Sequence, residues 1–352
     1  MSKRIAIVGV GALGGYVGGH LAQAGHDVTL IDFWPANIEA IRNHGLQLDG
    51  MSEEERFTVT GVNALHVSDV QRLAREAPID IAMVSVKSYD TEWATTLIRQ
   101  YLSPNGYVVS LQNCLNEERI ANIVGWGRTV GAIASMISVD MPEAGHVLRT
   151  IPKMGDRHTV FRAGEVHGRI SRRIEELVEL FSLVDSAKAT TNLWGERWSK
   201  LVLNGMVNGV SSATGLTAAA VNQNPAVRRF SIQLAGEAVR VGQALGYELE
   251  KIGRFEPEEL ARATEGDTAA LERIEAELTK AAKPNPRDDI RRPSMAQDVM
   301  KGRRTEIEFI NGYIAQKGEE IGIPAPTHSR LTELVTAIER GELTPDPSHL
   351  GG

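Results

Sequence analysis

Residues 4–15 read RIAIVGVGALGG, and this stretch decides the fold of the N-terminal half of the chain. Residues 4–10 form a short apolar run rich in β-branched side chains, which is typical of a buried strand. Glycines at positions 9, 11 and 14 follow with the spacing GxGxxG. The next apolar positions recur near helical spacing until Gly25: Leu13, Val17, Leu21 and Ala24. A strand, a glycine-rich turn and a helix in this order predict a dinucleotide-binding unit.

Each glycine of this turn has a physical reason in such a unit. Gly9 permits the tight turn, Gly11 lets a pyrophosphate approach the backbone, and Gly14 lets the helix pack on the strand. The first N–H groups of the helix, around Ala12 and Leu13, would hold the phosphates together with the positive end of the helix dipole. The alternative is a glycine-rich turn that holds no ligand.

Asp32 stands 18 positions beyond Gly14, at the end of a second predicted strand that covers residues 27–32. A carboxylate at this place accepts a hydrogen bond from the 2′-hydroxyl of an adenine ribose and repels a 2′-phosphate. The sequence therefore favours NAD over NADP as cofactor. The alternative is that Asp32 caps the following helix.

Strands and helices continue to alternate, which predicts a doubly wound parallel sheet with helices on both faces, the Rossmann α/β class. The expected strands are residues 79–87, 106–112 and 129–134, and the expected helices are residues 90–102 and 116–124. We expect residues 135–170 to supply the last, partly antiparallel, strands of the same domain. Two polar residues follow strands at the edge where ligands bind, Lys87 and Asn113. The alternatives are a solvated strand end for Lys87 and a turn former for Asn113.

The pattern becomes helical from about residue 171, so we expect an all-α C-terminal domain. The predicted domains are residues 1–190, which bind the dinucleotide, and residues 191–352, which bind the substrate and carry catalysis. Residues 225–247 and 295–317 are predicted long helices. Residues 256–292 are highly charged and end in Lys-Pro-Asn-Pro, which predicts an inserted pair of exposed helices and a linker.

Lys200, Asn204 and Asn208 are spaced four residues apart in a predicted helix. Four residues advance a helix by slightly more than one turn, so the three side chains share one face. A lysine followed by two amides along a mostly apolar helix favours a buried polar network, in which partial burial would tune the lysine for proton transfer. The alternative is a lysine that extends from the helix edge into solvent.

Ser294 and Gln297 have the spacing of a capping box, which predicts the start of a helix. A helix start with a serine hydroxyl can also bind a carboxylate. Glu306 is expected further along the same helix, where an isolated glutamate is normally a surface residue.

The composition restricts the remaining possibilities. The chain has 352 residues, of which 42% are hydrophobic and 24% charged, with a net charge of −7. Because it has no long basic block and no apolar run near bilayer length, we expect no nucleic-acid partner, no membrane partner and a cytoplasmic location. Cys114 is the single cysteine, so no internal disulfide forms, and we interpret it as a packing residue. The nine histidines show no metal-ligand spacing, and we expect no metal site.

Five pieces of the sequence together resemble the ketopantoate reductase (2-dehydropantoate 2-reductase) family. The matching stretches are GVGALGG at 9–15, VSVKSYDT at 84–91, SLQNCLNEE around Asn113, KLVLNGMVN at 200–208, and RPSMAQDVMKGRRTEIEFINGYI at 292–314. The resemblance implies that Lys200 is the general acid and that Asn113, Asn204 and Asn208 line the substrate. It also implies that Ser294 holds the substrate carboxylate, that Glu306 contacts the reacting hydroxyl or Lys200, and that Lys87 and Asn113 lie near the cofactor.

The expected function is therefore hydride transfer between a nicotinamide cofactor and a 2-keto acid, and we expect a homodimer. Family members that reduce ketopantoate usually use NADP, whereas Asp32 resembles the NAD-dependent subset that acts on other D-2-hydroxy acids. Two alternatives remain from the residues alone. One is a related two-domain dehydrogenase of a 3-hydroxy acid or an opine, and the other is a protein that senses NAD without turnover.

Overall fold

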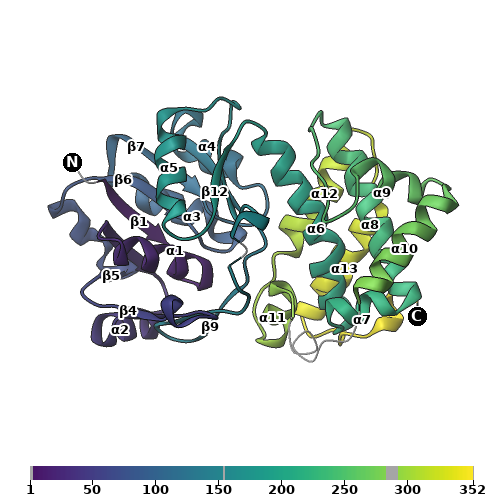
Figure 1. Ribbon diagram of the computed structural model, residues 1–352, viewed down its shortest axis with the longest axis horizontal. Coiled ribbons are helices and arrows are strands. Elements are labelled where there is room, and N and C mark those ends of the chain that lie inside the picture. The colour runs from purple at the N-terminus through teal and green to yellow at the C-terminus, as the bar shows by residue number, and fades with distance from the viewer. Residues whose placement is uncertain (1–2, 154, 283–291, 352) are drawn as a thin grey trace. The chain divides into compact units, whose positions relative to one another are not determined.

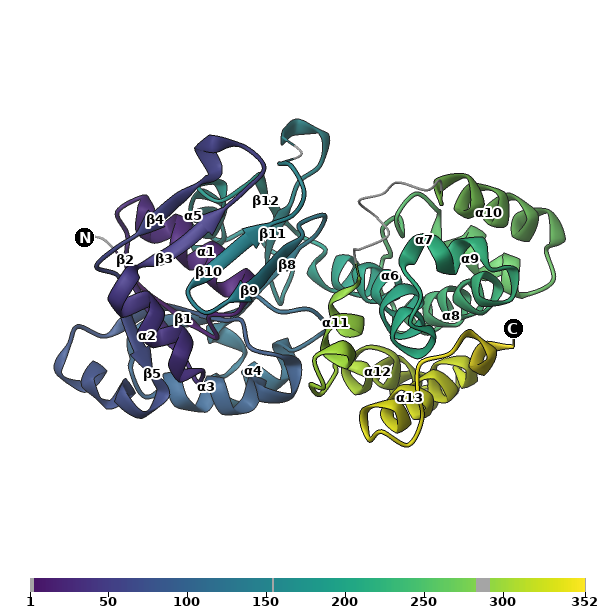
Figure 2. The ribbon, with the colours of Figure 1, turned by 90° about the horizontal axis from the view of Figure 1, so that it is seen from below.

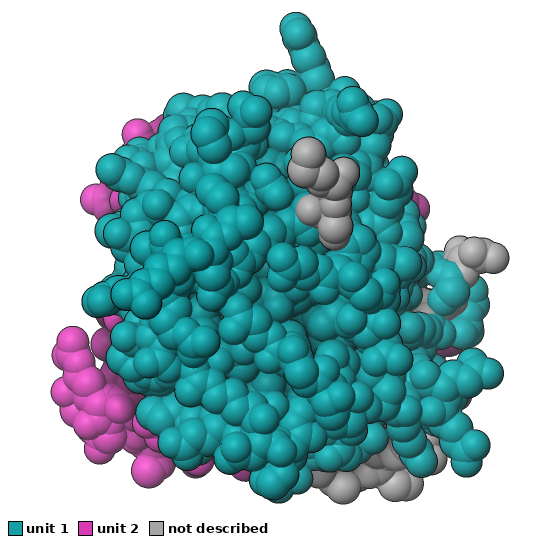
Figure 3. All heavy atoms as spheres, turned by 90° about the vertical axis from the view of Figure 1, so that its left-hand side faces the viewer, with its two compact units in different colours: residues 1–193 teal, residues 194–352 magenta. Residues whose placement is uncertain are grey.

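The computed structural model describes residues 3–153, 155–282 and 292–351. The chain divides into two compact units, Met1–Leu193 and Trp194–Gly352, which we call unit 1 and unit 2 (Figures 1 and 3). Residues 283–286, the Lys-Pro-Asn-Pro part of the predicted linker, lie outside the described residues.

Unit 1 is built on an eight-stranded sheet with the order β12-β11-β8-β7-β6-β1-β2-β5. The strands are β1 (Arg4–Val8), β2 (Asp27–Asp32), β5 (Asn63–His66), β6 (Ile79–Val84), β7 (Leu102–Ser110), β8 (Thr129–Ala134), β11 (Phe161–Glu165) and β12 (Ala187–Thr190). The six strands from β5 to β8 pair in parallel, and β11 is antiparallel to β8. This is the doubly wound topology that the sequence predicts.

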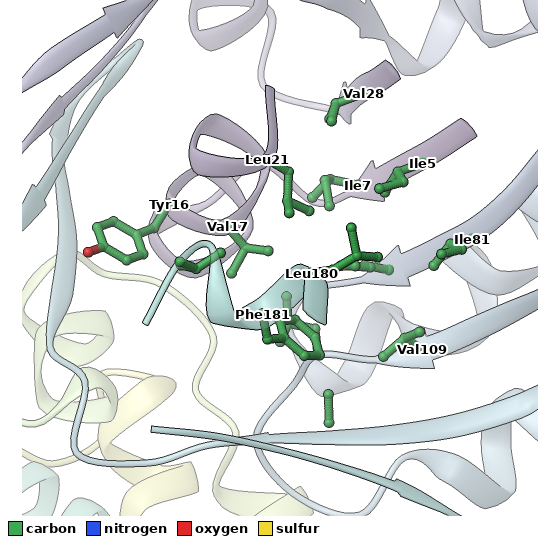
Figure 4. Close-up of a cluster of buried hydrophobic side chains, with 14 of the residues drawn as sticks. Ile5, Ile7, Tyr16, Val17, Leu21, Val28, Ile81, Val109, Leu180 and Phe181 are labelled. Atoms are coloured by element: carbon green, nitrogen blue, oxygen red, sulfur yellow. The ribbon is translucent and has the colours of Figure 1, made fainter. Parts of the chain in front are cut away.

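Both faces of this sheet are covered, so successive residues of a strand enter different cores. In β1, Ile5 and Ile7 face one core and Ala6 and Val8 face the other. The first core includes Val17 of α1, and Figure 4 shows it from within. The helices are α1 (Ala12–Gln23), α2 (Pro35–His44), α3 (Thr91–Arg99), α4 (Glu117–Val124) and α5 (Arg172–Ser182). Burial on both sides explains why the strands read as continuous apolar runs in the sequence.

A second sheet of four strands lies against α1 and was not predicted (Figure 2). Its order is β4-β3-β10-β9, from β3 (Leu46–Asp49), β4 (Phe57–Val59), β9 (Val139–Glu143) and β10 (His146–Arg149). Residues 139–149, expected among the last, partly antiparallel, strands of this domain, form its antiparallel β9–β10 pair, but they do so in this second sheet. This second sheet can pack closely on α1 because Gly15 has no side chain: a Cβ atom there would lie 2.9 Å from Val147 of β10.

Unit 2 is helical in its described residues. Its helices are α6 (Leu193–Thr214), α7 (Ala218–Gln223), α8 (Pro225–Ala244), α9 (Pro257–Thr264), α10 (Thr268–Ala281), α11 (Ser294–Met300), α12 (Ile307–Glu320) and α13 (Pro326–Glu339). Together with the parallel sheet of unit 1, these helices confirm the predicted fold class. Across the described parts of the chain, we find no helix whose length and apolar character would let it cross a membrane.

Two details of unit 2 differ from prediction. The charged segment does form two helices, α9 and α10, but they are not simply exposed: Leu260 and Ile274 are fully buried. Thr264 also packs so closely on α8 that a Cβ on Gly236 would lie 2.3 Å from its hydroxyl. The single helix predicted over 295–317 is interrupted between α11 and α12, where Gly302 adopts a φ of 61° that ends a helix.

A buried polar chain fixes the position of α6. Asn311 of α12 donates through Nδ2 to the carbonyl of Gly205 at 3.0 Å and to Nδ1 of His328 at 3.0 Å. His328 of α13 bonds through Nε2 to the carbonyl of Leu234 in α8 at 2.8 Å. These contacts join α6 to α12, and through α12 to α13 and α8.

Candidate functional site

The glycine turn has the geometry that a dinucleotide site requires. Gly9 has a φ of 99°, and a Cβ there would lie 2.7 Å from the backbone of Val86. A Cβ on Gly14 would lie 2.1 Å from the carbonyl oxygen of Gly9, which leaves no room for a side chain between helix and turn. A Cβ on Gly11, at the N-cap of α1, would meet nothing within 4 Å. Of the three glycines, only Gly11 has free space beside its Cα atom. A pyrophosphate can approach the backbone only where such space exists.

The amides at the start of α1 complete this cradle. Ala12 is the first residue of the helix, and Leu13 and Gly14 complete its first turn. The first N–H groups of a helix have no partner within the helix, and the dipole adds a partial positive charge there. A nicotinamide dinucleotide thus fits this end of unit 1, with the pyrophosphate at α1.

Asp32 ends β2 beside the turn, and its carboxylate is only 6% exposed. Its Oδ2 accepts from the backbone N–H of Val10 at 2.9 Å and from Nδ2 of Asn37 at 3.2 Å, and its Oδ1 accepts from the N–H of Trp34 at 3.0 Å. Burial raises the pKa of Asp32, and the hydrogen bonds from these donors oppose that rise. Asp32 does not cap α2, because the N-cap is Trp34.

Two aromatic side chains follow Asp32 directly. Phe33 is 55% exposed and Trp34 is 37% exposed, although both are large apolar groups. Exposed aromatic rings offer flat surfaces on which a planar base can stack.

The loops after β6 and β7 are tied to each other by side-chain amides. Gln112 donates to the carbonyl of Val86 at 2.8 Å and to Oγ1 of Thr91 at 2.9 Å. These bonds hold the segment that carries Lys87 against the segment that carries Asn113. Both Lys87 and Asn113 are half-buried.

The carbonyl of Asn113 accepts from Nδ2 of Asn116 at 2.9 Å, and the same amide donates to Ser88 at 3.1 Å. Cys114, which follows Asn113, is buried and has a φ of 66°. Residues other than glycine rarely adopt this left-handed conformation. Packing therefore determines its place, but at the cost of backbone strain in the turn that presents Asn113.

Within unit 2, α6 carries the predicted polar face. Lys200, Asn204 and Asn208 all lie on this helix and all are half-buried. An adjacent face of α6 is closely packed: a Cβ on Gly209 would lie 2.8 Å from Leu331 and one on Gly205 3.3 Å from His328. One side of α6 is thus fixed by its neighbours and another presents a lysine and two amides in a row.

Ser294 and Glu306 lie on different elements, which corrects the prediction of one shared helix. Ser294 is the exposed first residue of α11, and Pro293 is the N-cap. The predicted capping box is wrong: Gln297 donates from its side chain to the carbonyl of Arg292 at 3.0 Å instead. Glu306 is the N-cap of α12 and is 6% exposed, so it is not the surface residue that an isolated glutamate normally is.

The predicted residues divide into two sets, one in each unit. The first contains the carboxyl ends of neighbouring strands in unit 1, with the glycine turn, Asp32, Lys87 and Asn113. The second lies in unit 2, with Lys200 and the two asparagines of α6 in one row and with Ser294 and Glu306 at helix starts. Among the residues that the structure describes, no group of three metal-ligating side chains gathers.

Sequence reasoning missed Asn37, Gln112, and the pair Asn311 and His328. All four are almost fully buried. Each stands inside or beside an amphipathic or apolar segment, where a polar residue at a core position is the only available signal. Their partners include backbone groups far along the chain, which the sequence does not identify.

Comparisons with known proteins cover nearly the whole chain. Residues 5–159 match the family model described as ketopantoate reductase PanE/ApbA, and residues 192–339 match the model of its C-terminal domain. The 2-dehydropantoate 2-reductase of Archaeoglobus fulgidus is 29% identical over 340 residues, covering 96% of this chain and 99% of the relative. That of Pyrococcus horikoshii is 28% identical, covering 96% and 97%.

Solved structures show the same fold. A PanE/ApbA family ketopantoate reductase from Ralstonia eutropha has a TM-score of 0.77 at 26% identity, covering 97% of this chain and 99% of its own. The ternary structure of D-mandelate dehydrogenase with NADH and anilino(oxo)acetate has a TM-score of 0.76 at 22% identity, covering 96% and 99%.

Proposed function

Because the chain belongs to the ketopantoate reductase family, we propose that it is a nicotinamide-dependent oxidoreductase that interconverts a 2-keto acid and a 2-hydroxy acid. The observation that carries the proposal is the glycine turn, which is closed to side chains at Gly9 and Gly14 and open at Gly11. The substrate is ketopantoate, as in the names of the relatives, or another 2-keto acid that gives a D-2-hydroxy acid.

The cofactor residues are those of unit 1. The backbone from Gly9 to Gly14 takes the pyrophosphate, Asp32 takes the adenine ribose, and Lys87 and Asn113 take the nicotinamide end. We propose NAD rather than NADP, because a 2′-phosphate would meet the fixed carboxylate of Asp32. A bound reduced nicotinamide supplies the hydride that the C2 carbonyl carbon receives.

The proton is supplied by unit 2. The Lys200 ammonium donates to the carbonyl oxygen of the substrate as that oxygen gains negative charge, and its own positive charge stabilises the developing alkoxide. Asn204 and Asn208 lie one and two turns further along α6, so their amides can bind the substrate beside the lysine.

The remaining residues orient the substrate. The hydroxyl of Ser294 donates to the substrate carboxylate, and the amide of Asn113 binds the substrate. Glu306 is almost buried, and we assign it to the reacting hydroxyl or to Lys200, where a carboxylate would favour the charged form of the lysine. Residues 1–190 then act as the cofactor domain and residues 191–352 as the substrate domain of a homodimer.

The decisive experiment follows NADH absorbance while purified protein is offered a panel of acids: ketopantoate, other branched and aromatic 2-keto acids, 3-keto acids, and a 2-keto acid with an amino acid. We expect turnover with a 2-keto acid alone. Turnover only with a 3-keto acid, or only with the pair that forms an opine, would replace this proposal by a related dehydrogenase. Tight NADH binding without turnover on any acid would indicate a sensor.

A further inference from the structure

Asn37 is a fully buried amide that contacts the cofactor end of unit 1 and that none of the roles above includes. It lies in the first turn of α2, and every hydrogen-bonding group of its side chain is used. Nδ2 donates to the carbonyl of Val10 at 3.0 Å and to Oδ2 of Asp32 at 3.2 Å. Oδ1 accepts from the backbone N–H of Gly145 at 2.8 Å.

Asn37 and Asp32 both bond the backbone of Val10, at the two peptide units on either side of its Cα atom. The N–H of Val10 donates to Asp32 while the carbonyl of Val10 accepts from Asn37, and Asn37 also bonds the carboxylate itself. The three residues close a ring of hydrogen bonds. Val10 stands between Gly9 and Gly11, so this ring joins the position of the Asp32 charge to the position of the turn.

The amide is itself fixed from the opposite side. Gly145 forms the turn between β9 and β10, and a Cβ there would lie 2.9 Å from Ala40 of α2. The second sheet is therefore docked on α2 at this point. Asn37 cannot turn its amide over without placing its N–H groups against the N–H of Gly145.

From this geometry we propose that Asn37 is a positioning residue that sets the preference for NADH over NADPH by fixing the carboxylate of Asp32. The inference rests on the proposed dinucleotide site. Discrimination against a 2′-phosphate requires a carboxylate that is ionised and that cannot rotate away. The Nδ2 donor stabilises the ionised form, and the ring of bonds selects one side-chain rotamer.

The test compares Asn37→Leu, which has a similar volume without hydrogen bonds, and Asn37→Ser, which is smaller and polar. Dissociation constants for NADH and for NADPH are measured by fluorescence titration without any acid substrate. We expect the ratio of the NADPH constant to the NADH constant to fall by about tenfold in both variants, as loss of a charge-assisted hydrogen bond implies. Asn63→Leu is the matched control, because the Asn63 amide bonds Thr29 of the same β2 strand, away from the turn.

A double-mutant cycle separates positioning from a merely structural role. If Asn37 acts through the carboxylate, Asn37→Leu changes the ratio in the wild-type background and leaves it unchanged in an Asp32→Ser background. An equal change in both backgrounds, or a ratio within twofold of wild type in a folded variant, would overturn the assignment. If neither variant folds, as judged by circular dichroism, the amide is a determinant of the fold and the assignment is withdrawn.

These measurements are independent of turnover. A wild-type protein that binds NADH better than NADPH but reduces no 2-keto acid would contradict the proposed reaction and leave the role of Asn37 intact. A wild-type protein that reduces ketopantoate without preferring NADH would support the proposed reaction and contradict the role of Asn37.

Discussion

His328 accepts a hydrogen bond at Nδ1 from Asn311 in the interior of unit 2, where neither side chain is exposed to solvent. The other ring nitrogen faces the carbonyl of Leu234, which can only accept, so the ring proton is assigned to Nε2. This pair requires a neutral imidazole. A second ring proton would point at the N–H group of Asn311.

We predict that the stability of the protein falls as the pH is lowered from about 6.5 to about 4 because of this pair. Burial lowers the pKa of His328 from 6.5 to about 4 in the folded protein. The unfolded chain therefore binds more protons than the folded chain in this window, which favours unfolding. The contribution is fully present above the unfolded pKa and amounts to a loss of about 2 kcal/mol between pH 7 and pH 5.

Urea unfolding at both pH values measures this loss. His328→Gln should show a smaller pH dependence than wild type, and His44→Gln, at an exposed position, should match wild type. His20 contributes in the same direction, because burial and the charges of Lys153 and Arg149 lower its pKa to about 4. An unchanged pH dependence in His328→Gln would show that the buried imidazole does not titrate in this range.

Two alanine substitutions in the glycine turn should have opposite signatures. Gly11→Ala adds a methyl group to open space, so we expect a change in unfolding free energy below about 1 kcal/mol and weak dinucleotide binding. Gly14→Ala forces a methyl group against the carbonyl of Gly9 and should destabilise unit 1 by about 1–3 kcal/mol. Thermal unfolding and NADH titration of each variant decide the matter. Normal NADH affinity in Gly11→Ala would remove the pyrophosphate from this turn.

The carboxylate of Asp32 should make NADH at least about tenfold better than NADPH in kcat/KM, since like charges a few ångströms apart cost roughly 1–4 kcal/mol. We expect Asp32→Ser to reduce this preference and Asp32→Arg to reverse it. Steady-state kinetics with both cofactors is the measurement. A wild-type preference for NADPH would contradict the argument and favour ketopantoate itself as substrate.

Lys200→Ala should lower kcat by at least about 10²-fold, because it removes the proposed proton donor. NADH affinity should stay near that of wild type, because the proposed cofactor residues lie on unit 1. Lys251→Ala is the control, since Lys251 is exposed and pairs with Glu256 at the surface. Turnover near the wild-type rate in Lys200→Ala would exclude Lys200 from the mechanism.

Ser294→Ala should raise the KM for the keto acid by about tenfold or more through the lost hydrogen bond to a carboxylate. Because Pro293 is the N-cap of α11, we expect no loss of stability of the size that a missing cap causes. Kinetics and thermal unfolding are measured on the same preparation. A lower melting temperature with an unchanged KM would assign Ser294 to the fold.

The sequence was a good guide where local periodicity and tertiary structure agree. The first strand, the glycine turn and the helix carrying Lys200 were each predicted from a local pattern, one that spans no more than about twenty residues. The second sheet was missed because β10 pairs with β3 far along the chain, and short strands carry little periodic signal. The helix break at Gly302 was missed because flanking helical patterns concealed a single residue of positive φ.

Buried polar groups were the other limit. Asn37 and His328 look like ordinary helix residues in the sequence, and only the tertiary structure shows that each bonds across more than one element. For the same reason the capping spacing of Ser294 misled: Gln297 found a carbonyl outside the helix that the local pattern does not reveal.

The pairing of β3 with β10 has a consequence for how the chain folds. His146 bonds Asp49 across 97 positions, and β10 is the only parallel neighbour that β3 has in its sheet. During synthesis, therefore, the edge of β3 stays without this partner until almost a hundred further residues have left the ribosome. Contacts of such long sequence separation slow folding and leave strand edges open to wrong pairing. The second sheet is therefore completed only when the β9–β10 hairpin arrives, which also places Gly145 against Asn37.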